Sequence, residues 1–209
     1  MRQIVRDAAA VALTLTLGVG LTACGGSDGD SSPSSTATAA NGDVFNDADV
    51  QFATDMIQHH AQAVQMVVIS QGRPLDPEVR RLAEDIRVTQ VPEIEQLVDW
   101  LTAWDQEIPE TAMDHTNMGH DMDDLGTAME GMAEMPGGMT AEQMESLQNA
   151  SDAEFQTRWL EMMIEHHQGA VEMAQDEQED GTSSDAVALA ETIIATQQDE
   201  ITTMKDLLP

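Results

Sequence analysis

The sequence predicts an all-α protein, an antiparallel four-helix bundle made of two duplicated αα-hairpins that are joined by a Met-rich connecting segment. Three observations support this fold class. A Met-Ile-x-His-His cassette occurs twice, 107 residues apart. Around each copy, apolar residues recur every three or four positions, as on one face of a helix. No stretch alternates with a period of two, and the chain has no Tyr and only 3 Phe, so strand signals are absent.

The duplication extends well beyond the cassette. Residues 56–101 align with residues 163–208 without a gap, and 18 of the 46 aligned pairs are identical. Four of the 6 histidines fall at equivalent positions of the two copies. Each copy has the length of one helical hairpin with an apolar stripe, and two such hairpins can bury their stripes only against each other.

The helices follow in order. Asn46, Asp47 or Asp49 can cap a first helix that runs to about residue 71, where a Gly-Arg-Pro turn follows. A second helix opens with Pro77 and runs to about 104, and Pro92 predicts a kink near residue 88. The second copy predicts helices from about 151 to 179 and from about 185 to 208. We therefore expect one domain over 45–209, consisting of hairpin 45–104, connector 105–150 and hairpin 151–209. Within the connector, Thr140 can cap a short helix.

The N-terminus resembles a bacterial lipoprotein leader. Residues 1–23 combine a basic start with an apolar run that is too short to span a membrane. The run ends at Cys24, the only cysteine, which lies where a lipobox is cleaved and lipidated; the alternative is an ordinary signal peptide with a chance cysteine. Residues 24–44 are mostly Gly, Ser, Asp, Thr, Ala and Pro, which predicts a lipidated Cys followed by a flexible linker.

The formal net charge is −31, with 39 acidic and 8 basic residues. Phosphate binding needs a basic surface, so nucleic acid is excluded as a partner. The charge would concentrate cations near the protein, although a well-solvated secreted protein explains it equally well.

Each cassette places methionine and histidine on the buried stripe of its helix. On a helix, Met56 and His60 form one row, and His59 and Met66 form the next. The pseudo-symmetry of a bundle brings the second set towards the first, as in metal sites that bundles build from facing helices. Alternatively, the histidines are ordinary core residues. The thioether and imidazole donors that the two cassettes offer are Met56, His59, His60, Met66, Met163, His166, His167 and Met173.

Polar residues at four further positions interrupt the apolar stripes of the second and fourth helices. They are Gln90 and Glu93 in the first copy, and Gln197 and Glu200 in the second. A carboxylate there needs a partner, and a metal-bound imidazole usually donates its other N–H to a carboxylate or amide oxygen. We therefore expect these residues to support the histidines. Polar residues on a helix surface are the alternative.

The connector carries eight methionines and the other two histidines. Its densest part alternates thioether and imidazole every two to four residues, through Met113, His115, Met118, His120 and Met122. Cu(I) and Ag(I) accept such donors with loose geometry, so this part is a candidate capture site or, alternatively, a passive linker. Because the connector methionines lack helical spacing, we expect deletion of 111–139 to leave the bundle folded.

Catalytic constellations are missing from the sequence. There is no Gly-x-Ser-x-Gly motif and no Gly-rich phosphate loop. The di-iron carboxylate pattern needs Glu three residues before a His, but Met56 and Met163 stand there. This favours copper over O₂-activating iron and a binding protein over an enzyme.

The duplicated motif Met-Ile-x-His-His-x-x-Ala-Val-x-Met, with Leu-Ala-x-x-Ile-x-x-x-Gln-x-x-Glu-Ile after it, resembles the domain of unknown function 305 family over about residues 45–209. The resemblance implies a ferritin-like four-helix protein of the bacterial envelope. It also implies copper binding through the eight His and Met residues of the two cassettes.

Together these observations predict a copper-binding protein on the extracytoplasmic face of the cell membrane, lipid-anchored through Cys24. It would sequester or transfer Cu(I) or Cu(II), with Cu(I) as the preferred ion and Ag(I) as a surrogate. A copper-donor or copper-acceptor protein is a possible partner, and an oligomer is possible. Two alternatives stay open: a redox enzyme acting on copper ions, and a helical partner-binding module without metal.

Overall fold

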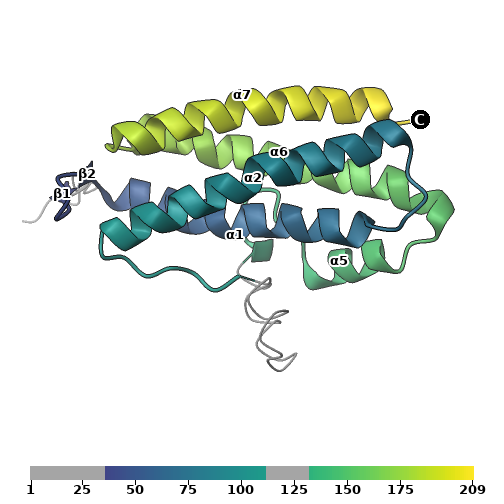
Figure 1. Cartoon of the computed structure of the whole chain (residues 1–209), viewed down its shortest axis with the longest axis horizontal. Coiled ribbons are helices and arrows are strands. Elements are labelled where there is room, and N and C mark those ends of the chain that lie inside the picture. Colours follow the sequence, from purple (N-terminus) through teal and green to yellow (C-terminus); the bar gives the residue numbers. More distant parts are fainter. Residues whose placement is uncertain (1–35, 112–131) are drawn as a thin grey trace, which may run out of the picture. The chain divides into compact units, whose positions relative to one another are not determined.

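The computed structural model describes residues 36–111 and 132–209. It contains the four long helices that the sequence predicts: α1 (Asp47–Ser70), α2 (Pro77–Ala103), α6 (Asp152–Asp180) and α7 (Ser184–Leu207). Helix α1 packs against α2 and α6, and α6 packs against α7 (Figure 1). The all-α bundle of two hairpins is confirmed. Helix α2 includes Pro92 and stays helical on both sides of it.

The predicted caps hold the helix starts. Asn46 caps α1 in a capping box with Asp49, and Pro77 opens α2. Asp49 also accepts hydrogen bonds from the main-chain N–H groups of Thr182 and Ser183. The same residues that start α1 therefore tie it to the turn between α6 and α7.

The opposite end is tied by an arginine. The Arg73 guanidinium, in the turn after α1, donates to the main-chain carbonyls of Ala150 and Gln148 and pairs with Asp152 at 3.0 Å. These residues precede or begin α6. Because the Arg73 guanidinium is charged, its hydrogen bonds to these carbonyl oxygens are stronger than bonds between neutral groups. They hold the turn after α1 against the start of α6.

The absence of strands was predicted wrongly for a short stretch. Two-residue strands, β1 (Ala37–Thr38) and β2 (Val44–Phe45), pair antiparallel around a turn in which Gly42 has φ +97°. Strands this short show no alternation in the sequence. The Phe45 ring stacks on Trp104 with centroids 4.8 Å apart, and Ala39 of the predicted flexible linker packs against the same apolar cluster, so part of that linker is folded against the bundle.

The connector is more ordered near its end than predicted. Thr140 caps a short helix, α5 (Ala141–Gln148), in a capping box with Gln143. Met132, Met139 and Met144 are buried, with 2%, 0% and 4% of their surfaces exposed. The expectation that the connector methionines stay out of the core is therefore wrong for these three. Met139 and Met144 pack in a cluster with residues of α1 and α6, which local spacing does not reveal.

The core is divided by the histidines. One apolar cluster contains Met66 and Met163, and the other contains Met56 and Met173. Along α1 and α6 the histidines lie between the two methionines of their helix, so a polar layer separates two apolar ones. No helix within residues 36–111 and 132–209 is long and apolar enough to cross a membrane.

Candidate metal centre

Four histidines meet at the interface of α1 and α6. His59, His60, His166 and His167 are each at most 1% exposed. They reach the interior because adjacent residues on a helix differ by about 100°, so each pair covers both edges of the buried stripe. The sequence prediction that the two pairs come together is met for His59 and His166, whose ring centroids are 3.7 Å apart.

One histidine of each pair is held by a carboxylate. The Nε2 of His60 lies 2.7 Å from Oε2 of Glu93, and Nε2 of His167 lies 2.8 Å from Oε2 of Glu200. The two contacts are pseudo-symmetric and join α1 to α2 and α6 to α7. They are the imidazole–carboxylate contacts expected from the polar interruptions of the stripes.

The other two histidines differ from each other. His59 donates from Nε2 to the carbonyl oxygen of Pro136 at 3.1 Å, because a carbonyl can only accept. His166 makes no hydrogen bond from either ring nitrogen. The repeat is therefore symmetric in its carboxylate-supported histidines and asymmetric in its facing ones.

Five imidazole nitrogens of this layer are buried without a hydrogen-bond partner. They are Nδ1 of all four histidines and Nε2 of His166. Where Nε2–H donates to a carbonyl or carboxylate, a neutral imidazole has a bare lone pair at Nδ1. Buried polar atoms are rarely left unsatisfied in folded proteins, and each such group needs an explanation.

Burial keeps the facing histidines neutral. It lowers the pKa of His59 to about 3, with the charge of His60 as the next cause. Burial also lowers the pKa of His166 well below its usual range, with His59 as the next cause. A neutral imidazole is the form that binds a metal.

Thioethers flank the histidine layer on both sides. Met56, Met66 and Met163 are fully buried, and Met173 is 8% exposed. Gln90 is buried with both amide atoms unpartnered, and Gln197 is buried with Oε1 unpartnered. The donors available here are therefore imidazole nitrogens and thioether sulfurs, with amide and carboxylate groups behind them.

Sequence reasoning missed a segment that packs over this layer. Gln62 donates from Nε2 to the carbonyl of Met139 at 2.8 Å and accepts the Met139 N–H at 2.7 Å. At the aligned position of the second copy, Gly169 lies so close to Pro136 that a Cβ would meet its carbonyl oxygen at 1.9 Å. Residues 132–139, called the strap below, thus hold Pro136 against His59. A glycine in the middle of a helix was the available signal.

Other predicted residues are not tested by this geometry. Cys24 and the connector ligands Met113, His115, Met118, His120 and Met122 lie outside the described residues. Among residues 36–111 and 132–209, no three His, Cys, Asp or Glu side chains converge as a metal cluster. A set of three or more ligands in this part of the chain would include other donors, such as the thioethers. Nitrogen and thioether donors without hard oxygen ligands fit a soft metal ion.

Comparison with known proteins identifies the family of this chain. Residues 49–208 match the model of the DUF305 domain of unknown function. A DUF305 protein of Streptomyces coelicolor, named as a secreted protein, is 36% identical over 77% of this chain and 91% of its own, with a TM-score of 0.62. A DUF305 fragment of Deinococcus radiodurans is 27% identical over 82% of this chain and 97% of its own, with a TM-score of 0.64.

A third solved protein carries copper. CopM in its Cu(II)-bound form is 25% identical over 76% of this chain and 94% of its own, with a TM-score of 0.58, and a Cu(I)-bound form also matches. A comparison with curated proteins gives no match. These solved relatives are named by their family or by the metal they bind rather than by a reaction, in line with a binding protein. Since its family match spans both hairpins, the chain belongs to the DUF305 family.

Proposed function

We propose that this protein binds copper as Cu(I) in the layer between α1 and α6 and sequesters or transfers it without turning over a substrate. The ligands would come from His59, His60, His166 and His167, together with Met56, Met66, Met163 and Met173. Copper is the cargo in this proposal. Glu93 and Glu200 would orient the imidazoles that they hydrogen-bond.

The observation that carries the proposal is the set of five buried imidazole nitrogens without partners. A metal ion would satisfy lone pairs that no protein group satisfies. Ordinary core histidines would be expected to find acceptors and donors. The copper-bound forms of CopM add that this fold, at 25% identity, accommodates copper.

The choice of Cu(I) follows from the donors. Thioether and neutral imidazole are soft to borderline ligands, whereas Mg²⁺ and Ca²⁺ select carboxylate and carbonyl oxygens. The carboxylates nearest the histidines are occupied by hydrogen bonds to Nε2. We expect Ag(I) to substitute for Cu(I), and Zn²⁺ to bind more weakly.

A titration of the metal-free domain with Cu(I) under anaerobic conditions, in competition with a chromogenic chelator, tests the proposal. Replacing Met56, Met66, Met163 and Met173 by Leu keeps the volume of each side chain and removes its sulfur. We expect the affinity to fall at least about tenfold, equivalent to about 1.4 kcal/mol, while the unfolding midpoint changes little. Met144→Leu, a buried methionine of the same core, is the control and should bind as the parent does.

A second variant separates binding from packing. Replacing all four histidines by Ala should abolish tight Cu(I) binding, with helicity followed by circular dichroism. Unchanged affinity in both the methionine and the histidine variants would disprove the bundle centre.

We also propose that the protein is anchored outside the cytoplasm through lipid on Cys24 and that the connector ligands capture copper for the centre. Replacing Met113, His115, Met118, His120 and Met122 by Ser should lower the number of Ag(I) ions bound per chain. Cys24→Ser should release the protein from the membrane fraction, because a lipid chain contributes about 0.8 kcal/mol per buried CH₂ group. Retention of a processed Cys24→Ser protein would point to another anchor.

A further inference from the structure

An acidic hollow opens at one end of the bundle. It has a volume of about 210 Å³ and lies between the first half of α1 and the last half of α6. Four carboxylate side chains line it, and Met173 belongs to its lining as well. The hollow therefore reaches from the surface to one of the thioethers that flank the histidine layer.

One of these carboxyl groups is buried against another. Glu177 is 2% exposed, lines the hollow, and shares a side-chain hydrogen bond with Asp49. Two carboxyl groups in contact do not both ionise readily, so Glu177 borders the hollow as a protonated acid and not as a charge. Gly181 leaves the space for it, because a Cβ at this position would meet Oε1 of Glu177 at 2.4 Å.

The repeat supplies an internal control for the hollow. Its three acidic residues on α6 have no acidic counterpart in the first copy: Asp176 aligns with Ile69, Glu177 with Ser70 and Asp180 with Arg73. The Ser70 hydroxyl donates to the carbonyl of Val67 at 2.7 Å. The position that carries a buried carboxyl group at the hollow in one copy thus carries a hydroxyl group bonded within its own helix in the other.

The α1 side of the hollow differs in the same way. Ala48 aligns with Phe155, and Asp55 aligns with Met162. Phe155 and Met162 are buried in the apolar cluster at the other end, and the Arg73 guanidinium lies 4.5 Å from the centre of the Phe155 ring. These larger apolar groups occupy the equivalent positions there, and the hollow beside Ser70 and Arg73 at that end does not include Met66 in its lining.

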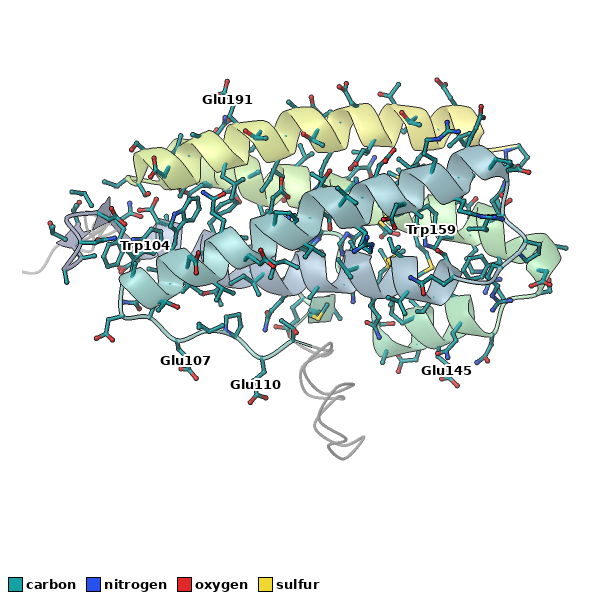
Figure 2. The ribbon with its side chains drawn as sticks, in the orientation of Figure 1. Trp104, Glu107, Glu110, Glu145, Trp159 and Glu191 are labelled. Atoms are coloured by element: carbon teal, nitrogen blue, oxygen red, sulfur yellow. The ribbon has the colours of Figure 1, made fainter. Side chains whose placement is uncertain are left out.

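The two pairs of thioethers consequently differ in access. Met66 is completely buried, and the indole N–H of Trp159, labelled in Figure 2, donates to its carbonyl at 3.0 Å. Its counterpart Met173 is 8% exposed and lines the hollow. One end of the histidine layer is closed by packing, and the other opens towards carboxylates.

We propose that this hollow is the entrance through which copper ions pass between solvent and the centre, with Asp55, Asp176 and Asp180 as the carboxylates that attract the cation and Met173 as the first thioether to receive it. The inference rests on the copper-binding function proposed above. It adds a direction: ions enter at the end formed by the start of α1 and the end of α6. Carboxylates that line a hollow raise the local concentration of cations and hence the association rate.

The test compares loading rates with affinities. In the variant Asp55→Asn, Asp176→Asn and Asp180→Asn, the shape is nearly conserved and three charges are removed. We expect its Cu(I) or Ag(I) loading rate, measured by stopped-flow mixing of the metal-free protein, to fall about tenfold. The equilibrium affinity should stay within about twofold, since the predicted ligands are intact.

A matched control removes three charges elsewhere. Glu107, Glu145 and Glu191 are exposed and lie away from the hollow (Figure 2), and their triple replacement by Gln should leave the loading rate nearly unchanged. Equal slowing in both triple variants would show general attraction by the acidic surface and overturn the entrance. An unchanged rate in the hollow variant would overturn it too.

Filling the hollow gives a second, charge-neutral test. Ala48→Phe copies the residue found at the sealed end and should slow loading without changing the net charge; unslowed loading in a folded variant would contradict the entrance. If the unmodified protein binds no copper, the proposed function fails and this inference fails with it. If it binds copper and neither variant is slowed, only the entrance is wrong.

Discussion

The two copies of the repeat agree where they support the histidine layer and differ where they border it. His60–Glu93 and His167–Glu200 are nearly superimposable contacts, at 2.7 and 2.8 Å. The neighbouring histidines are not equivalent. His59 donates a hydrogen bond to the carbonyl oxygen of Pro136, whereas the ring nitrogens of His166 make none. A duplicated scaffold thus retains a shared support while each copy acquires its own surroundings.

The differences lie at aligned positions, which makes them informative. Gln62 and Gly169 align, and both contact the strap, one by two hydrogen bonds and the other by leaving space. Ser70 and Glu177 align, and they lie at the sealed and the open end. In each case, the residue at the aligned position of one copy shows what the other copy has changed.

The largest effect is expected where the strap approaches α6. Gly169→Ala would place a Cβ at 1.9 Å from the Pro136 carbonyl oxygen, so either the strap or the helix must move. We expect a loss of about 3 kcal/mol in the free energy of unfolding, measured with urea. Gln168→Ala, an exposed neighbour on the same helix, should have little effect. A stable Gly169→Ala protein would mean that the strap is not held against α6.

The open end should carry its own pH dependence. Burial, and after it the neighbouring Asp49 and Asp180, raises the pKa of Glu177 to about 9 from 4.5; Asp55 and Asp176 also line this hollow. Between pH 4.5 and pH 9, Glu177 keeps its proton in the folded protein and loses it in the unfolded chain. The stability that this proton provides is therefore complete below pH 4.5 and is lost as the pH rises through 9.

Glu177→Gln removes this pH dependence. Relative to the parent, the variant should gain about 3 kcal/mol by pH 9, which allows for water reaching the ionised carboxylate. Urea unfolding at a series of pH values measures it, and Glu179→Gln, at an exposed position, is the control. Parallel curves for parent and Glu177→Gln would show that the carboxyl group titrates normally.

A smaller effect should distinguish the two facing histidines. His59→Ala leaves the Pro136 carbonyl without its donor, whereas His166→Ala removes a ring that makes no hydrogen bond. Both create a cavity of similar size. We therefore expect His59→Ala to be less stable than His166→Ala by about 1 kcal/mol in the metal-free protein. Equal losses would indicate that the strap does not depend on this bond.

The smallest difference is expected between the supporting carboxylates. Glu93→Gln and Glu200→Gln each replace an acceptor that holds an imidazole N–H, and their contacts are equivalent. Their unfolding free energies should agree to within about 0.5 kcal/mol. Clearly different unfolding free energies for the two variants would show that the two contacts are alike in geometry but not in their contribution to stability.

Local signals in the sequence were enough for the helices and for part of the centre. Asn46, Pro77 and Thr140 mark helix starts through their own side chains, and Glu93 and Glu200 were recognisable because a carboxylate on an apolar stripe requires a partner. The strap and the β1–β2 hairpin were not predictable in this way. Met139 and Met144 are buried in a cluster with residues far away in the chain, and two-residue strands carry no periodic pattern. Whether the cassettes bind metal stays a prediction.

The depth of the thioethers has a consequence under oxidising conditions. Methionine oxidation to the sulfoxide follows exposure, and the product is a polar group that disrupts a packed core. Met56, Met66 and Met163 are fully buried, whereas Met173 is slightly exposed at the open end and Met135 of the strap is half-buried. Among these five, oxidants would therefore reach Met135 and Met173 first. Peroxide damage would begin at the strap and the entrance and would spare the sulfurs at the sealed end.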